Sequence, residues 1–306
     1  MRIAFAGTPE VAIPSLDALI AAGHDIVAVI TRPDAPAGRG RTLAASPVAA
    51  HATERGIPVW KPERPADIAD DLAAAGVDVV AVVAYGALIP AAMLSIPRHG
   101  WINLHFSLLP AWRGAAPVQW AIIAGDDVTG ACTFRIETGL DTGPVYGSIA
   151  RPIAATDTAG VLLDALAIDG AQLLAQTLAS LDRLVPVPQR ADEVSLAPKL
   201  TKDDARVTWA HPALAIDRRI RGCTPDPGAW TEHLEARVVL APVSLRPDVT
   251  DLRPGELRAA GREVLVGTGS HAVALGRVKP AGRGWMDADA WWRGVRGVTE
   301  FVDATR

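Results

Sequence analysis

The 306-residue sequence contains very little cysteine. Cys132 and Cys223 are its only cysteines, and they lie far apart in the chain. Such a pair offers neither a disulfide framework nor a Cys-x-x-Cys zinc site. A reducing cytoplasm is therefore the expected compartment.

Long hydrophobic runs are also missing. A membrane-spanning helix needs roughly 20 consecutive apolar residues, and no stretch reaches that length. The longest apolar run, Val77 to Pro90, is interrupted by Asp78 and Gly86 and is typical of a buried strand followed by a loop. The first residues, Met1 to Gly7, are typical of a strand rather than a signal peptide. No membrane association is expected.

Two nucleotide-binding motifs are absent. A dinucleotide-binding fold requires Gly-x-Gly-x-x-Gly after the first strand, but only Gly7 precedes Thr8-Pro9. No Gly-Lys-Ser/Thr occurs either, which excludes a Walker phosphate loop. The histidines other than His105 show no metal-ligand spacing, so no metal is expected.

The sequence does contain enough apolar material for a large core. Hydrophobic residues make up 49% of the chain and charged residues 21%, which excludes wholesale disorder. The length suggests roughly two domains of about 150 residues each. Residues 1–206 carry a formal net charge of −6 and residues 207–306 one of +2. A weakly basic second half is usually a solvated surface, but it leaves a polyanionic partner open.

The first half of the chain alternates short apolar runs with helical patterns. Strands are predicted over Ile3–Ala6, Ile26–Ile30, Ile57–Trp60 and Val77–Ala84. Helices are predicted from Thr8-Pro9-Glu10 to Gly23, from Ser46-Pro47 to Gly56, and over Asp67–Ala75. This alternation predicts an α/β fold with a doubly wound, mostly parallel sheet and helices on both faces.

The pattern changes along the second half. Strands are predicted over Trp101–Phe106, Cys132–Ile136 and Val145–Ile149, and helices over Val118–Ala124 and Thr158–Leu181, the latter capped by Thr156 or Asp157. Residues 185–206 are proline-containing and weakly periodic, which indicates a linker. A helix over Leu214–Arg221 then precedes short strands at Arg237–Leu240, Val264–Gly267 and Ala272–Leu275. We therefore predict a first domain at 1–184 and a small C-terminal, OB-like β-barrel at 207–306.

Candidate chemistry begins in the segment Trp101 to Phe106. Side chains alternate faces along a strand, so Asn103 and His105 project on the same side. An amide and an imidazole at a strand end can converge on one carbonyl oxygen. An isolated Asn-x-His pair is more often a structural pair whose polar groups are satisfied by backbone.

An acidic residue follows in a glycine-bracketed loop, Gly139-Leu140-Asp141-Thr142-Gly143. Glycine permits turns that other residues resist and lets a ligand approach closely. A plain hairpin turn would explain this loop equally well. The segment Ser107 to Pro110 and Arg113-Gly114 follow directly after the strand that carries Asn103, where α/β sheets usually bind ligands.

Taken together, these segments resemble the folate-dependent formyltransferases. The signature of that family runs Asn-x-His-x-Ser-Leu-Leu-Pro, then Arg-Gly, then Asp-x-Gly about thirty residues later. Here it corresponds to Asn103–Pro110, Arg113-Gly114 and Asp141–Gly143, and the resemblance extends over the first 180 residues. Phe106 occupies a position that is often smaller in the family. The resemblance implies a Rossmann-like catalytic domain.

The resemblance also implies a mechanism. It implies 10-formyltetrahydrofolate as the formyl donor, with Asn103 and His105 donating to the oxyanion. Asp141 is expected to raise the pKa of His105 and to accept a proton from the attacking amine. The expected folate pocket is formed by Ser107, Leu108, Leu109, Pro110, Ala84, Tyr85, Gly86 and Leu88.

The amine that receives the formyl group is a separate question. The loop Thr31 to Leu43 is long and has a net charge of +2, which suits phosphate contacts but also an ordinary surface loop. The resemblance is strongest to family members that act on initiator methionyl-tRNA, where a similar loop enters the acceptor end and the C-terminal domain contacts the backbone. It implies a cytoplasmic, monomeric enzyme of translation initiation. The expected tRNA-binding residues are Arg39, Arg41, Lys199, Arg218, Arg219 and Arg221.

Other interpretations of the sequence stay open. An enzyme that formylates a sugar-nucleotide amine would share the same catalytic module. A glycinamide ribonucleotide formyltransferase would leave the last hundred residues unexplained. A non-catalytic tRNA- or nucleotide-binding protein with a doubly wound domain belongs to a different class. Folate-dependent transfer assays with each amine distinguish these interpretations.

Overall fold

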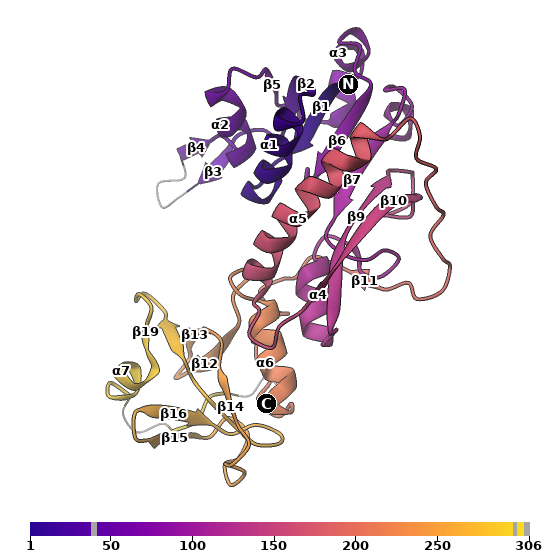
Figure 1. The fold of residues 1–306 in the computed structure, drawn as a ribbon. Coiled ribbons are helices and arrows are strands. Elements are labelled where there is room, and N and C mark those ends of the chain that lie inside the picture. Colours follow the sequence, from indigo (N-terminus) through magenta and orange to yellow (C-terminus); the bar gives the residue numbers. More distant parts are fainter. Residues whose placement is uncertain (38–41, 296–298, 303–306) are drawn as a thin grey trace. The chain divides into compact units, whose positions relative to one another are not determined.

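The computed structural model describes residues 1–37, 42–295 and 299–302. The chain divides into two compact units. The first unit comprises Met1–Pro117, Val128–Pro152 and Leu163–Ala197, and the second comprises Val118–Asp127, Ile153–Leu162 and Pro198–Arg306. The segment expected to be a linker is thus divided between the units at Ala197 and Pro198. Figure 1 labels most of the helices and strands described below.

The first unit is built on a seven-stranded sheet with the order β10-β9-β7-β6-β1-β2-β5. The strands are β1 (Arg2–Gly7), β2 (Asp25–Ile30), β5 (Val59–Trp60), β6 (Val79–Val83), β7 (Trp101–His105), β9 (Val128–Arg135) and β10 (Val145–Pro152). The five strands from β5 to β7 run parallel, whereas β9 pairs antiparallel with both of its neighbours, β7 and β10. The prediction of a mostly parallel sheet is confirmed.

Helices cover both faces of this sheet. The helices are α1 (Ile13–Ala21), α2 (Pro47–Glu54), α3 (Ala69–Ala74) and α5 (Ala159–Ala179), with short 3-10 turns at η1 (Glu10–Ala12), η2 (Pro65–Ile68) and η3 (Ala91–Met93). Trp101 of β7 faces a core that includes Leu72 of α3 and Met93 of η3. Further along β7, Leu104 points the other way and contacts Gly170 of α5. All of β6 is buried, as expected for a strand covered on both faces.

The predicted helix starts are partly confirmed. The Ser46 side chain caps α2 by accepting from the Ala49 N–H at 3.1 Å. The helical region predicted to begin at Thr8 starts with η1 at Glu10 and has no side-chain cap, because the Thr8 hydroxyl donates to the Tyr85 carbonyl at 2.8 Å. The first turn of α5 is capped by Thr158, which accepts from the Val161 N–H at 3.4 Å, rather than by Thr156 or Asp157.

The second unit contains two antiparallel four-stranded sheets, as expected for its run of short strands. The first consists of β12 (Trp230–His233), β13 (Ala236–Leu240), β18 (Arg277–Pro280) and β19 (Met286–Asp287). The second consists of β14 (Ser244–Arg246), β17 (Ala272–Ala274), β16 (Glu263–Val266) and β15 (Leu257–Ala260). The helices of this unit are α4 (Pro117–Ala124, whose first residue belongs to the first unit), α6 (Ala213–Gly222) and α7 (Ala288–Trp292).

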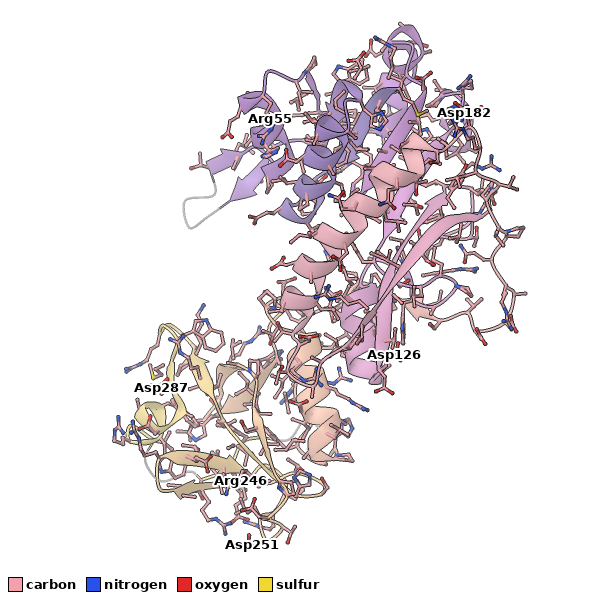
Figure 2. All side chains as sticks on the ribbon, in the orientation of Figure 1. Arg55, Asp126, Asp182, Arg246, Asp251 and Asp287 are labelled. Carbon is pink, nitrogen blue, oxygen red and sulfur yellow. The ribbon has the colours of Figure 1, made fainter. Side chains whose placement is uncertain are left out.

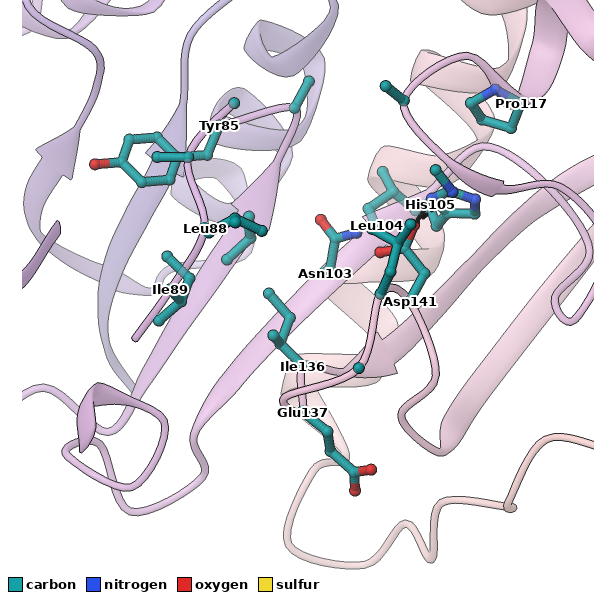
Figure 3. Close-up of a pocket in the computed structure, with 18 of the residues that line it drawn as sticks. Tyr85, Leu88, Ile89, Asn103, Leu104, His105, Pro117, Ile136, Glu137 and Asp141 are labelled. Atoms are coloured by element: carbon teal, nitrogen blue, oxygen red, sulfur yellow. Dashed lines mark hydrogen bonds and ion pairs between the residues drawn. The ribbon is translucent and has the colours of Figure 1, made fainter. Parts of the chain in front are cut away.

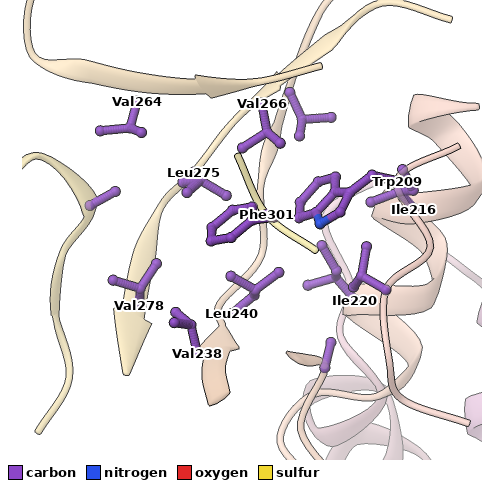
Figure 4. Close-up of a cluster of buried hydrophobic side chains, with 14 of the residues drawn as sticks. Trp209, Ile216, Ile220, Val238, Leu240, Val264, Val266, Leu275, Val278 and Phe301 are labelled. Carbon is purple, nitrogen blue, oxygen red and sulfur yellow. The ribbon is translucent and has the colours of Figure 1, made fainter. Parts of the chain in front are cut away.

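Both sheets of the second unit share one hydrophobic core. Trp209 and Phe301 stack with ring centroids 5.4 Å apart, and Phe301 also stacks on Trp291 at 5.6 Å. Valine and leucine side chains from both sheets, together with α6, surround these rings (Figure 4). Stacked aromatic residues therefore anchor this core.

Four short strands lie outside these sheets: β3 (Ala35–Ala37), β4 (Thr42–Ala44), β8 (Arg113–Gly114) and β11 (Leu196–Ala197). β3 and β4 form a hairpin within the predicted basic loop. Arg39 and Arg41, both predicted to contact tRNA, lie outside the described residues. β11 pairs with β8, so part of the expected linker is bound into the first unit.

Helix α5 is long and apolar enough to cross a membrane by length and composition alone. The core helix of a soluble protein passes the same test, and α5 packs Gly170 against Leu104 of the sheet. Charged side chains in both units, including Asp182 and Asp251, project outward (Figure 2).

Candidate active site

A cavity of about 660 Å³ opens at the carboxyl ends of β6 and β7 in the first unit. Its wall combines apolar side chains with the three polar groups singled out in the sequence: Asn103, His105 and Asp141 (Figure 3). The other lining residues come from β6 and the loop after it, from Leu104, Phe106, Gly114, Ala115 and Pro117, and from residues 136–140. The sheet edge predicted to bind a ligand is therefore the edge that carries the cavity.

Asn103 reaches the cavity from β7, where it pairs with Val82 of β6 and with Phe134 of β9. Its side chain is half-buried and points into the cavity (Figure 3). Within the described residues the amide makes no hydrogen bond to protein. Its N–H donors are thus available to a ligand atom.

His105 is held by the backbone of the following loop. Its Nε2 lies 2.9 Å from the carbonyl oxygen of Trp112, and because a carbonyl only accepts, Nε2 carries the proton. Trp112 has a φ of +61°, a left-handed conformation that is costly for a bulky residue. Nδ1 of His105 faces Asp141, 3.8 Å from Oδ2.

Burial decides the charge of His105. The ring is 6% exposed, and desolvation lowers its pKa below the ordinary value, although Asp141 and the Trp112 carbonyl act in the opposite direction. Asp141 thus raises the pKa of His105, as predicted, but desolvation of the ring outweighs this contribution and the net pKa is lowered. The protein presents a neutral imidazole with an unprotonated Nδ1 facing the carboxylate.

Asp141 is fixed by contacts from both sides of its loop. Its Oδ2 accepts from the Gly114 N–H at 2.8 Å, and its φ is +50°. The loop closes tightly at Gly143, where a Cβ would lie 1.7 Å from the Arg135 carbonyl oxygen. Glycine at 143 is thus required for the close approach, and the bracketing glycine has a structural reason.

The predicted folate residues divide into two groups. Ala84, Tyr85, Gly86 and Leu88 line the cavity, and Leu88 is 86% exposed at its edge. The segment Ser107 to Pro110 is not among the residues that line this cavity, so its contribution to a folate pocket stays a prediction. Ser107 is fully buried and donates to the Ala111 carbonyl at 2.6 Å. This segment forms the turn that brings Trp112 to His105.

The predicted phosphate-binding cations also differ in their surroundings. Lys199 is exposed. The Arg218 guanidinium packs against Gly125, and Arg219 donates to the Asp204 carbonyl. Arg221 is only 7% exposed, pairs with Asp217 at 2.8 Å and donates to the Asp157 carbonyl at 2.9 Å. Successive side chains of an α-helix point to different faces, and Arg221 lies on the buried face of its helix. It is therefore not available to contact a phosphate.

Sequence reasoning missed several residues that hold the site. They are the Trp112 carbonyl, the Gly114 N–H, and Gln189 and Ser195 of the expected linker. The Trp112 carbonyl and the Gly114 N–H are backbone groups, which every residue type offers, so only the Arg113-Gly114 motif pointed to this segment. Gln189 lies 48 positions from Asp141, which it contacts, and no local pattern predicts such a contact.

Comparison with known proteins identifies relatives over the whole chain. The formyl transferase family matches residues 1–178, and the C-terminal domain of formyl transferase matches residues 199–296. A protein of Paenarthrobacter aurescens named methionyl-tRNA formyltransferase is 60% identical over 297 residues, which cover 96% of this chain and 97% of that protein. The protein of Thermobifida fusca with the same name is 58% identical over 300 residues, which cover 97% of this chain and 97% of that protein.

Solved structures share the fold at low sequence identity. The methionyl-tRNA formyltransferase of Clostridium thermocellum matches with a TM-score of 0.58 at 15% identity, over 80% of this chain and 94% of that one. HypX from Aquifex aeolicus in complex with tetrahydrofolic acid matches with a TM-score of 0.65 at 18% identity, over 98% of this chain and 48% of that one. An N-formyltransferase of Helicobacter canadensis matches with a TM-score of 0.67 at 14% identity, over 89% of this chain and 97% of that one.

Proposed function

The chain belongs to the formyl transferase family, and on that premise we propose that it formylates the amino group of methionine on initiator methionyl-tRNA. The observation that carries the proposal is the convergence of Asn103, His105 and Asp141 on one cavity, in a chain whose full length resembles proteins named methionyl-tRNA formyltransferase. The product, N-formylmethionyl-tRNA, serves translation initiation. We assign the protein to the cytoplasm as a monomer.

The formyl donor in this proposal is a folate derivative, 10-formyltetrahydrofolate. The cavity has the volume of a small-molecule site. Leu88, Ile89 and Ile136 supply apolar wall for a flat ring, and the backbone of residues 84–89 supplies hydrogen-bonding groups at its edge. Ala84, with a φ of +48°, turns this backbone along the cavity wall.

The proposed reaction moves the formyl group from one nitrogen to another. The lone pair of the amine attacks the formyl carbon, and the carbonyl π electrons move to its oxygen. Asn103 donates an N–H to this oxyanion. Nδ1 of His105 accepts the proton that the attacking nitrogen releases. As the carbonyl reforms, the bond to the donor nitrogen breaks, and the imidazolium returns its proton to that nitrogen.

The His105–Asp141 pair suits this proton transfer. A neutral imidazole accepts the proton, and the resulting Nδ1–H points at the Asp141 carboxylate 3.8 Å away. The carboxylate thus stabilises the cation only after the transfer, when charge develops. The Trp112 carbonyl keeps the ring in the tautomer that leaves Nδ1 free to accept.

This role predicts a pH dependence for kcat. The neutral form of His105 dominates above its pKa, which burial holds below the ordinary value of 6.5. At saturating substrates, kcat is expected to be insensitive to His105 above neutrality and to fall about tenfold per pH unit below that pKa. Comparison with His105→Gln isolates this limb from the titration of the substrate amine. A wild-type kcat that decreased as pH rose from 6 to 8 would contradict the assignment.

Part of the second unit suits a tRNA backbone. Most of its described arginines are neutralised in ion pairs, such as Arg253 with Glu256 and Arg258 with Asp251. On the sheet β12-β13-β18, Arg206 pairs with Glu232 at 3.3 Å, whereas Arg237 makes no ion pair within the described residues. Trp230 lies under two guanidinium groups, those of Arg206 at 5.3 Å and Arg237 at 4.6 Å.

Lys279 extends this basic surface. Trp230 pairs with Val239, and Val239 pairs with Lys279, so all three side chains project from one face of the sheet. Lys279 is exposed and makes no ion pair within the described residues. A basic face with an aromatic ring is typical of sequence-independent nucleic-acid binding.

Binding of tRNA is therefore expected to weaken steeply with salt. Removing one lysine–phosphate interaction reduces the slope of log K against log salt by about 0.7 to 0.9. Lys279→Ala and Lys199→Ala are each expected to reduce the slope by about that amount, measured by filter binding at several salt concentrations. Arg258→Ala is the matched control, because Asp251 already neutralises Arg258. Salt-insensitive binding by the wild type would overturn the electrostatic assignment.

One assay tests the proposed function as a whole. Purified protein is supplied with 10-formyltetrahydrofolate and either charged initiator tRNA or a sugar-nucleotide amine, and the formylated product is quantified. Transfer to methionyl-tRNA but not to the sugar amine is expected. The reverse preference would assign the chain to the sugar-formylating branch, and folate-dependent transfer to neither amine would refute the proposal.

A further inference from the structure

Gln189 joins two loops of the active site through its side-chain amide. Its Nε2 donates to the backbone carbonyls of Asp141 at 2.7 Å and Gly143 at 2.8 Å. Its Oε1 accepts from Nε and Nη2 of Arg113 at 3.1 and 2.7 Å. Both donor hydrogens and both acceptor lone pairs of the amide are therefore used.

The chain around Gln189 is itself anchored to the first unit. Two residues before it, Val187 exchanges two backbone hydrogen bonds of 2.8 Å with Val145. Further on, Ser195 Oγ accepts from the Trp112 N–H at 2.9 Å, and the Ser195 carbonyl accepts from the Arg113 N–H at 2.9 Å. The segment from 187 to 197 is thus hydrogen-bonded to the first unit on both sides of Gln189.

The Gln189 contacts bear directly on the geometry of Asp141. The left-handed φ of Asp141, +50°, is unfavourable for a residue other than glycine and persists only where surrounding contacts impose it. Gln189 holds the carbonyl of this residue on one side. On the other side it holds Arg113, whose neighbour Gly114 donates to Asp141 Oδ2 at 2.8 Å.

We propose that Gln189 is a positioning residue for formyl transfer, acting through Asp141. Its amide fixes the turn that aims the carboxylate at His105, and it ties this turn to the Arg113–Gly114 strand. The inference rests on the proposed function for its kinetic consequence but not for its structural one. Gln189 is part of the catalytic unit although it lies in the segment that the sequence assigned to a linker.

Two substitutions separate the contacts of the amide. Gln189→Met retains length and loses all four hydrogen bonds. Gln189→Glu retains the acceptor for Arg113 but loses both donors and directs a carboxylate at the carbonyls of Asp141 and Gly143. Since a misplacement of about 1 Å can cost on the order of a hundredfold in rate, both variants are expected to lose about tenfold to a hundredfold in kcat. The KM for the folate substrate is expected to change less than kcat.

The matched control is Arg190→Met. Arg190 is the next residue, is exposed, and pairs only with Asp192 and Glu193 within the described residues, so the kcat of this variant is expected to equal that of the wild type. A second readout does not require activity. Amide hydrogen exchange over residues 137–144 is expected to accelerate in both Gln189 variants and not in Arg190→Met.

The outcomes are distinct. Loss of kcat together with faster exchange in both Gln189 variants supports the proposal. Wild-type kcat in Gln189→Met overturns it, as does full activity in Gln189→Glu, which would assign the effect to Arg113 alone. Unchanged exchange at the Asp141 turn also overturns it. A wild-type protein without transfer activity would refute the proposed function, while the exchange experiment would still decide whether Gln189 holds the turn.

Discussion

Replacing Asp141 by asparagine is expected to lower kcat for formyl transfer by about a thousandfold, within the range of proton-transfer catalysis. The substitution removes the negative charge 3.8 Å from His105 Nδ1, so the imidazolium formed during transfer loses its counterion in a buried site. The side-chain oxygen of asparagine can still accept from the Gly114 N–H. The loop, and with it folate binding, should therefore persist.

Single-turnover kinetics and equilibrium folate binding test this result together. Glu137→Gln is the matched control, because it removes a carboxylate from the same cavity wall, and its side chain is exposed and points away from Asn103 and His105 (Figure 3). Its kcat is expected to equal that of the wild type, because the Glu137 carboxylate does not face the reacting groups. Near-normal turnover in Asp141→Asn would remove Asp141 from the mechanism.

Replacing Asn103 by leucine is expected to lower kcat by about a hundredfold to a thousandfold, the loss that follows removal of one oxyanion donor. Leucine approximates the shape of asparagine and offers no N–H. Because His105 is neutral and directs its only N–H at Trp112, Asn103 is the side-chain donor that acts at the start of the reaction. The loss should therefore be in kcat rather than in folate affinity.

Measuring kcat and the dissociation constant of folate for the same variant separates a loss of catalysis from a loss of folate binding. Thr138→Val provides the control, because it removes a polar group from the same cavity at a position away from β7. If Asn103→Leu weakened folate binding as strongly as it lowered kcat, Asn103 would be a binding residue and not an oxyanion donor.

The parts of the site that were predicted correctly follow from local periodicity. Asn103 and His105 project on one face because side chains alternate along β7, and no other part of the chain can change that relation. The glycines around Asp141 likewise report a local need, since a Cβ at Gly143 would meet the Arg135 carbonyl. The alternation of strands and helices specified the parallel sheet for the same reason.

The burial of individual polar residues was harder to predict. Ser107 to Pro110 stay a prediction for the folate pocket that the family resemblance implies, and Ser107 itself is buried and donates to the Ala111 carbonyl. The Arg218 to Arg221 run looked like a basic cluster, but the helix turns Arg221 inward onto Asp217. A count of charges does not specify which of them pair.

By itself, the sequence predicted the candidate catalytic residues, and it determined the sheet on which they stand and the family to which the chain belongs. Only the tertiary structure decided the charge state of His105, because desolvation depends on what covers the ring and here outweighs the nearby carboxylate. Only the tertiary structure brought Gln189 to Asp141, since a contact across 48 positions leaves no periodic trace in the chain. The local sequence pattern sets the direction in which a side chain points. The pKa of that side chain and the hydrogen bonds that hold it in place depend on the segments that pack against it.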